Sequence, residues 1–169
     1  RVMSYDRRGF GRSDQPLGGY DYDTLADDLS AVMDALELDG AALVGFSMGG
    51  GEIARYMSRH GGKGVERVAF LSSVVPGLMQ CEDNPDGATP QMIDQIKEGI
   101  VQDRPAFLQS FLKLFYGVGA FRSPVSQAVL DWNWGIALQA SPLATTACVD
   151  AFGMTDFTPD VAQIGCPVL

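Results

Sequence analysis

Short apolar runs in the first part of the chain are typical of buried strands. They lie at residues 2–5, 41–44 and 65–71. Helical sequence separates them, so the expected order is strand, helix, strand, helix, strand. Consecutive parallel strands of one sheet are joined by right-handed crossovers. The pattern therefore predicts the α/β class, with a parallel, doubly wound sheet.

The helix expected between the first two strands has an apolar stripe. Its members recur at helical spacing: Leu25, Leu29, Val32, Met33 and Leu36. Thr24 followed by Asp27 is typical of a helix start, and Asp39-Gly40 marks the end. We expect this helix to pack its stripe against the sheet.

The pattern changes at Pro76, because residues 76–158 carry no strand signal. Helix starts recur there, each with a proline where its missing N–H costs nothing: Thr89-Pro90, Arg104-Pro105, Ser123-Pro124 and Ser141-Pro142. Thr155–Pro159 is expected to return the chain to the sheet, where Pro167–Leu169 begins another strand. The expected organisation is a core at residues 1–75, a helical cap at 76–158 and the start of the next core strand at 159–169.

The pentapeptide Gly45-Phe46-Ser47-Met48-Gly49 lies between the second strand and the helix after it. A G-x-S-x-G sequence at a sharp strand-to-helix turn is a nucleophile elbow, whose glycines avoid collisions with the adjoining strand or helix. The turn strains Ser47 and projects its hydroxyl out of the sheet. The N–H of Met48, at the helix start, can then stabilise an oxyanion. Five such residues can also match by chance, but the strand before and the helix after favour a catalytic serine.

A second glycine-containing block, Asp6–Asp14, follows the first expected strand. Its Gly9-x-Gly11 could suggest a dinucleotide loop, but Asp14 holds the third glycine position and no helix begins there. Together with Gly45–Gly51, the block resembles the α/β-hydrolase superfamily, and more narrowly its cofactor-free haloperoxidase, perhydrolase and arylesterase group. The resemblance covers essentially the whole chain and extends through Arg59-His60-Gly61, Phe115-Tyr116-Gly117, Ala140-Ser141-Pro142 and Thr155-Asp156-Phe157.

This resemblance implies a serine hydrolase that acts on small carboxylic esters, with Ser47 as nucleophile and the Met48 N–H in the oxyanion hole. It also implies conversion of a carboxylic acid and hydrogen peroxide to a peracid that oxidises halide without metal or haem. Ester hydrolysis and perhydrolysis share an acyl-enzyme, so the sequence does not rank them. Two alternatives stay open. One is other chemistry of the superfamily, such as a lactonase or C–C bond hydrolase, and the other is a non-catalytic binding protein on the same fold.

A serine nucleophile needs a base, and the single histidine is His60. It lies thirteen residues after Ser47 at the far end of the same helix, which corresponds to roughly 18–20 Å. We therefore interpret His60 as a helix C-terminal residue. In this fold the acid and the histidine follow the serine in the chain, and the resemblance implies that both lie beyond Leu169. Asp156 and Asp160 precede the last expected strand and are interpreted as cap and turn residues.

The ends of the sequence suggest an internal fragment of a longer hydrolase. There is no initiator methionine, and the chain starts at the edge of one expected strand and stops within another. The second oxyanion N–H is expected before Arg1. No signal peptide is visible, although a missing N-terminus would conceal one.

Apolar residues of the cap, and of the segment after the strand at 65–71, are candidates for a substrate pocket. The resemblance implies that such residues line the acyl pocket, at Val74, Leu78, Phe111 and Phe115. For the helical stripe of Phe107, Leu108, Phe111, Leu112 and Phe115, core packing of helix against helix is the alternative. Trp132 and Trp134 point nearly opposite ways on a helix, so at most one of them faces inward.

Composition narrows the class of partner. Of 169 residues, 46% are apolar, which suffices for one domain with a substantial core. The net charge of −9 argues against nucleic acid or an anionic membrane, and no run has the length of a transmembrane helix.

Cys81, Cys148 and Cys166 lie far apart without C-x-x-C spacing, which predicts reduced thiols, no zinc site and a cytoplasmic protein. We expect no cofactor and no metal. The expected partner is a small-molecule ester or carboxylic acid, and a homo-oligomer is left open.

Overall fold

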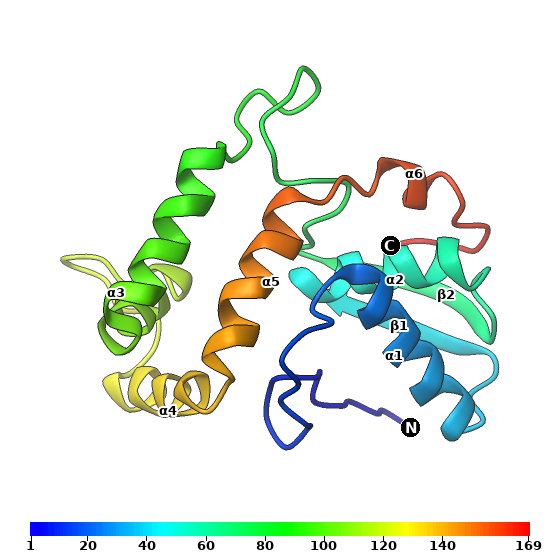
Figure 1. Ribbon diagram of the computed structural model, residues 1–169, viewed down its shortest axis with the longest axis horizontal. Coiled ribbons are helices and arrows are strands. Elements are labelled where there is room, and N and C mark those ends of the chain that lie inside the picture. The colour runs from blue at the N-terminus through cyan, green and yellow to red at the C-terminus, as the bar shows by residue number, and fades with distance from the viewer. The chain divides into compact units, whose positions relative to one another are not determined.

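A computed structural model describes residues 1–169. The chain divides into two compact units, and Figure 1 labels their helices and strands. The first unit consists of Arg1–Gly18 and Gln91–Thr146, and the second of Gly19–Pro90 and Ala147–Leu169. The elements, in chain order, are α1 (Tyr22–Ala35), β1 (Ala41–Phe46), α2 (Met48–Arg59), β2 (Val65–Leu71), α3 (Pro90–Phe115), α4 (Gln127–Leu138), α5 (Pro142–Met154) and α6 (Thr158–Val161).

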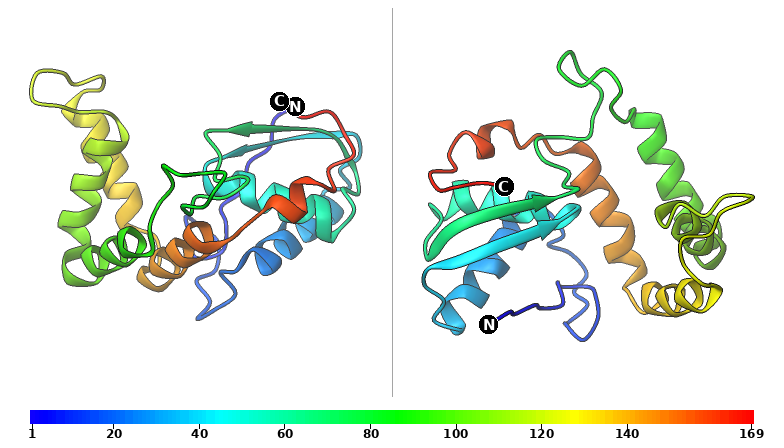
Figure 2. Two further views of the ribbon diagram at one scale, coloured as in Figure 1. Left: turned by 90° about the horizontal axis from the view of Figure 1, so that it is seen from above. Right: turned by 180° about the vertical axis from the view of Figure 1, so that it is seen from behind.

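The second unit is built on a parallel pair of strands. β1 and β2 pair in parallel from Ala41 opposite Val65 to Phe46 opposite Leu71, and α2 is the crossover between them. α1 and α2 lie on one face of this pair (Figure 2). Their core is a cluster of Ala26, Leu29 and Met33 from α1, Ile53, Tyr56 and Met57 from α2, and Val68 from β2. The predicted βαβ order and parallel pairing are therefore confirmed.

Residues 167–169 add the beginning of a further parallel strand to β2. Val68 N donates to Pro167 O at 3.0 Å, and Phe70 N donates to Leu169 O at 2.8 Å. In a parallel ladder, alternate residues bond to opposite neighbours. Because the Leu71 carbonyl bonds toward the β1 side, residues 167–169 occupy the other edge of β2. Residues 167–169 thus bridge to β2 where the sequence predicts the start of a strand, and α6 precedes them.

The strand predicted at residues 2–5 is wrong, because the structure assigns no strand there. Val2 is 96% exposed, so its apolar side chain buries nothing within the chain. A short apolar run becomes a strand only where a neighbouring strand accepts its backbone hydrogen bonds. The pattern of the sequence identifies an apolar run, but it does not show whether a neighbouring strand is present.

The N-cap of α1 lies three residues before the predicted cap, Thr24. Asp21 is the N-cap, and its carboxylate accepts hydrogen bonds from Thr24 N at 2.9 Å and Thr24 Oγ1 at 2.8 Å. Thr24 is therefore a partner of the cap instead of the cap itself. The helix ends at Ala35, before Gly40, and the last member of its predicted stripe, Leu36, is half exposed.

Proline positions predicted most helix starts of the first unit. α3 begins at Pro90 and has a non-helical residue at Asp103, with φ −153° and ψ 81°. Asp103 Oδ1 accepts from Ala106 N at 3.0 Å, so the segment at Arg104-Pro105 starts anew as predicted. α5 begins at Pro142 as predicted, but α4 starts at Gln127 because Ser126, and not Ser123, caps it.

The compact units do not follow the expected division at residues 75 and 158. Residues 1–18 group with helices of the expected cap, because Gly9 O accepts from Ser141 N at 2.8 Å and Gln15 Nε2 donates to Gln139 O at 3.3 Å. At the other end, Phe157 is fully buried in the second unit, where its N–H donates to Pro76 O at 2.7 Å. None of the helices combines the length and hydropathy needed to span a membrane.

Candidate active site

Ser47 occupies the sharp turn between β1 and α2. Its φ of 51° and ψ of −122° lie in a region that non-glycine residues rarely adopt. The turn is held by backbone hydrogen bonds on both sides. Ser47 N donates to Leu71 O at 3.0 Å, while Ser47 O accepts from Gly50 N at 3.0 Å and from Val74 N at 3.3 Å. The strained geometry expected of a nucleophile elbow is present.

Close packing at the elbow requires glycine at its first position. A β-carbon on Gly45 would lie 2.7 Å from Gly49 O, Gly50 N and Gly50 Cα, which are backbone atoms that cannot turn away. Any side chain at residue 45 would therefore displace the first turn of α2 from the strand. This is the collision that the G-x-S-x-G sequence predicts.

Met48 is the first residue of α2, so its N–H belongs to the donors that a helix leaves without an intrahelical partner. The same residue is anchored through its carbonyl, which accepts a hydrogen bond from Tyr22 Oη at 3.2 Å. Tyr22 is buried and meets Phe157 edge to face, with ring centroids 4.7 Å apart. The N–H that would face an oxyanion is thus carried by a supported turn.

Sequence reasoning missed Tyr22 and Phe157. The run Gly49-Gly50-Gly51 did signal that something approaches the helix closely. A β-carbon on Gly51 would lie 2.7 Å from two ring atoms of Tyr22 and closer still to Phe157. The glycines predict a close approach, but only the tertiary structure names the residues that make it.

His60 caps the far end of α2, as expected. Its Nε2 lies 2.8 Å from Asp27 Oδ1, and its ring stacks on Tyr56 with centroids 5.3 Å apart. Hydrogen bonds from Arg59, and then from His60, lower the pKa of Asp27 to about 2. His60 therefore belongs to an ion-pair group between α1 and α2 and cannot reach Ser47.

Asp156 and Asp160 have structural partners, in agreement with their interpretation as cap and turn residues. Asp156 Oδ1 accepts from Thr158 N at 2.8 Å at the start of α6, and its hydrogen bonds to Thr158 lower the pKa of the carboxyl. Asp160 is buried, pairs with Arg55 Nε at 3.0 Å and accepts from the Ser58 hydroxyl. Both carboxylates therefore stabilise the turn into α6 and its contact with α2.

The four predicted pocket residues fall into two environments. Val74 is buried in a cluster with Tyr22, Leu25, Ala54 and Phe157, and Leu78 packs against its edge. Phe111 and Phe115 lie on α3 in the first unit, where they are 46% and 51% exposed and have ring centroids 6.0 Å apart. Packing within the chain therefore leaves about half of each of these side chains exposed. Their place in an acyl pocket stays a prediction.

A family model of the α/β hydrolase fold matches residues 1–126. The chain belongs to this family. The match spans the elbow, β1, β2 and α3, so the fold class predicted from the sequence is confirmed.

Relatives of this chain confirm the narrower resemblance as well. A non-heme chloroperoxidase of Streptomyces lividans is 39% identical over 100% of the chain, and a bifunctional esterase/perhydrolase of Acinetobacter calcoaceticus is 37% identical over the same extent. Among solved structures, a bromoperoxidase from Bacillus anthracis is 46% identical, with a TM-score of 0.91 over 97% of the chain. The chain covers 62% of each of the two relatives and 60% of the bromoperoxidase.

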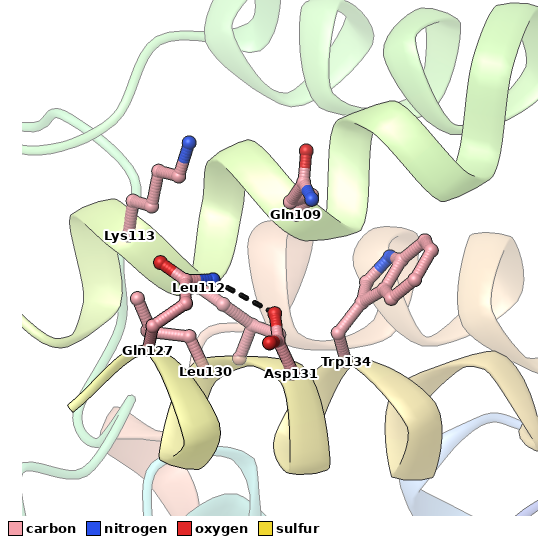
Figure 3. Close-up of a pocket in the computed structure, with 7 residues that line it drawn as sticks. All are labelled: Gln109, Leu112, Lys113, Gln127, Leu130, Asp131 and Trp134. Atoms are coloured by element: carbon pink, nitrogen blue, oxygen red, sulfur yellow. Dashed lines mark hydrogen bonds between the residues drawn. The ribbon is translucent and has the colours of Figure 1, made fainter. Parts of the chain in front are cut away.

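A small cavity lies between α3 and α4 (Figure 3). Its volume of about 10 Å³ accommodates roughly one water molecule. Gln127 Nε2 donates to Asp131 Oδ1 at 2.7 Å along its wall. No predicted site residue contributes to its lining, which comprises Gln109, Leu112, Lys113, Gln127, Leu130, Asp131 and Trp134. This cavity is too small for an ester substrate.

The two tryptophans of α4 differ as predicted. Trp134 is partly buried and donates from Nε1 to Pro105 O at 2.9 Å, whereas Trp132 is 68% exposed.

All three cysteines are free thiols.

Proposed function

We propose that Ser47 is the nucleophile of a serine hydrolase that cleaves small carboxylic esters through an acyl-enzyme. The observation that carries this proposal is the left-handed backbone of Ser47 between β1 and α2. A serine pays this conformational cost where the surrounding structure enforces it, and such residues concentrate at functional sites. The relatives named as esterase/perhydrolase and chloroperoxidase support the same chemistry.

In the proposed reaction, Ser47 Oγ attacks the ester carbonyl while a histidine accepts the hydroxyl proton. The tetrahedral oxyanion accepts a hydrogen bond from Met48 N–H, at the positive end of α2. Collapse of this intermediate releases the alcohol and leaves an ester of Ser47. Water then releases the acid and restores the serine. We place the histidine and its orienting aspartate beyond residue 169, because His60 is engaged at the far end of α2.

Hydrogen peroxide can replace water in the second step. Its oxygen attacks the acyl-serine carbonyl, the bond to Ser47 Oγ breaks, and the products are a peracid and the free hydroxyl. The acyl-enzyme itself forms from an ester or from a carboxylic acid with loss of water. The peracid oxidises halide outside the protein. The residues predicted for the acyl pocket, Val74, Leu78, Phe111 and Phe115, are all apolar, which favours an apolar acyl group.

Fluorophosphonate labelling of the full-length protein tests the nucleophile. We expect one label, on Ser47, and complete loss of labelling in Ser47→Ala. Ser123→Ala is the matched control, because it removes a serine hydroxyl that bonds locally to Val125 O, and its labelling should equal the wild type.

Labelling that persists in Ser47→Ala would contradict the assignment. An unlabelled wild-type protein that still binds esters would instead favour the non-catalytic alternative. Where Ser47 does label, turnover of lactones in preference to acyclic esters would shift the proposal to a lactonase.

A further inference from the structure

The segment after β2 lies directly against the elbow. Phe46 pairs with Leu71, so Ser47 and Ser72 are the first residues beyond two neighbouring strands. Both have positive φ, 51° at Ser47 and 43° at Ser72. Val74 N donates to Ser47 O at 3.3 Å, which ties the segment to the strained serine. Two adjacent strand ends are therefore held in conformations that L residues rarely adopt.

Within this segment, Ser73 faces the first turn of α2. A β-carbon on Gly50 would lie 2.7 Å from Ser73 Cβ and closer still to Ser73 Oγ, and 3.1 Å from Phe70 Cδ1. Gly50 is buried, and its N–H donates to Ser47 O at 3.0 Å. Ser73 thus occupies the space that a side chain at residue 50 would need.

The Ser73 hydroxyl also fixes its own turn. Ser73 Oγ accepts a hydrogen bond from Val75 N at 3.2 Å, the local arrangement by which serine stabilises a turn. This holds the side chain in the orientation that meets Gly50. On another side of the same helical turn, Tyr22 Oη donates to Met48 O at 3.2 Å. The first turn of α2 is consequently supported both through Gly50 and through Met48.

We propose that Ser73 is a positioning residue for the nucleophile elbow, which sets the first turn of α2 and with it the Met48 N–H. This inference rests on the proposed function of Ser47. In this proposal Ser73 acts through its packing against Gly50. A displacement of about 1 Å at such a site costs on the order of 100-fold in rate, so this support should be visible in kcat.

Compensating substitutions in the full-length protein test the proposal. Gly50→Ala should push the helical turn away from Ser73 and lower kcat for a small ester by about 100-fold, with KM within about twofold. Adding Ser73→Gly frees the space for the new methyl group. The kcat of the double variant should therefore exceed that of Gly50→Ala by at least about tenfold. Ser73→Ala alone should lower kcat about tenfold, because Val75 N loses its acceptor. Ser123→Ala, which loses a hydroxyl bond remote from the elbow in sequence, should match the wild type.

Urea unfolding of the same variants separates positioning from stability. Coupling between Gly50→Ala and Ser73→Gly in the free energy of unfolding reports the packing contact without reference to activity. Recovery of stability without recovery of kcat would leave Ser73 only a structural role and overturn the proposal. A Ser73→Ala variant with wild-type kcat would do the same.

A full-length wild type whose turnover does not depend on Ser47 would overturn the proposed function, and with it the role of Ser73. That failure is distinguishable, since the unfolding coupling would still show whether Ser73 and Gly50 are in contact.

Discussion

The backbone of Ser47 links packing to chemistry at the scale of a single residue. A residue held in a sparsely populated conformation costs of order 1–3 kcal/mol. The hydrogen bonds of Ser47 to Leu71, Gly50 and Val74 offset this cost, and all three arise from the pairing of β1 with β2 and the turn into α2. The strain is therefore stored at the group proposed to react. If this position had no function, we would expect either glycine there or a turn with ordinary backbone angles.

A second prediction at the scale of a residue asks whether Phe115 lines a pocket or packs in a core. Its ring is 51% exposed, so Phe115→Ala should cost less than the ~3–5 kcal/mol of a buried phenylalanine. As a pocket residue it should shift the ratio of kcat/KM toward bulkier acyl groups by about tenfold in the full-length protein. Melting curves and an acyl-chain series on one sample measure both effects. Phe121→Ala, which removes a fully exposed ring, is the control. A large loss of stability with an unchanged series would exclude Phe115 from the pocket.

Element order was predictable from the sequence, whereas contacts between distant elements were not. Helix spacing, the glycine elbow and the prolines that begin α3 and α5 are local signals, and each of them led to a correct element. The strand at residues 2–5 failed because a strand depends on a partner that periodicity does not reveal. The pair of Arg55 and Asp160 was invisible for the same reason, since 105 residues separate its members.

That ion pair joins α2 to α6 and supports a prediction at the scale of elements. Asp160 is only 6% exposed, and Arg55 keeps a raised pKa despite its burial, through hydrogen bonds to Asp23 and Asp160. Asp160→Asn should lower the free energy of unfolding by about 1–3 kcal/mol, because the partly buried Arg55 loses one of its two charged hydrogen-bond partners. Asp34→Asn breaks a pair with Lys63 in which both side chains are more than half exposed, and should cost under about 1 kcal/mol. Equal losses in urea unfolding would contradict a special role for the buried pair.

At the scale of the whole molecule, the only histidine of the chain lies out of reach of the proposed nucleophile. Ser47 precedes α2 and His60 follows its last residue, and the twelve residues of the helix hold them about 18 Å apart. His60 is moreover engaged by Asp27 and stacked on Tyr56. The elbow and the proposed oxyanion donor thus lie within residues 1–169, whereas the proposed reaction needs a general base other than His60.

We therefore expect negligible esterase turnover from a protein consisting of residues 1–169. Loss of a triad member lowers kcat by about 10⁴–10⁶-fold, because an unactivated serine is a poor nucleophile. Initial rates on a small activated ester, compared with the same chain carrying Ser47→Ala, measure this, and circular dichroism checks that both are folded. The two rates should coincide near the uncatalysed background. Turnover that disappears in Ser47→Ala would show that a base lies within these residues. Loss of the same turnover in His60→Gln would identify His60 as that base, and α2 would then have to unwind to bring it to Ser47.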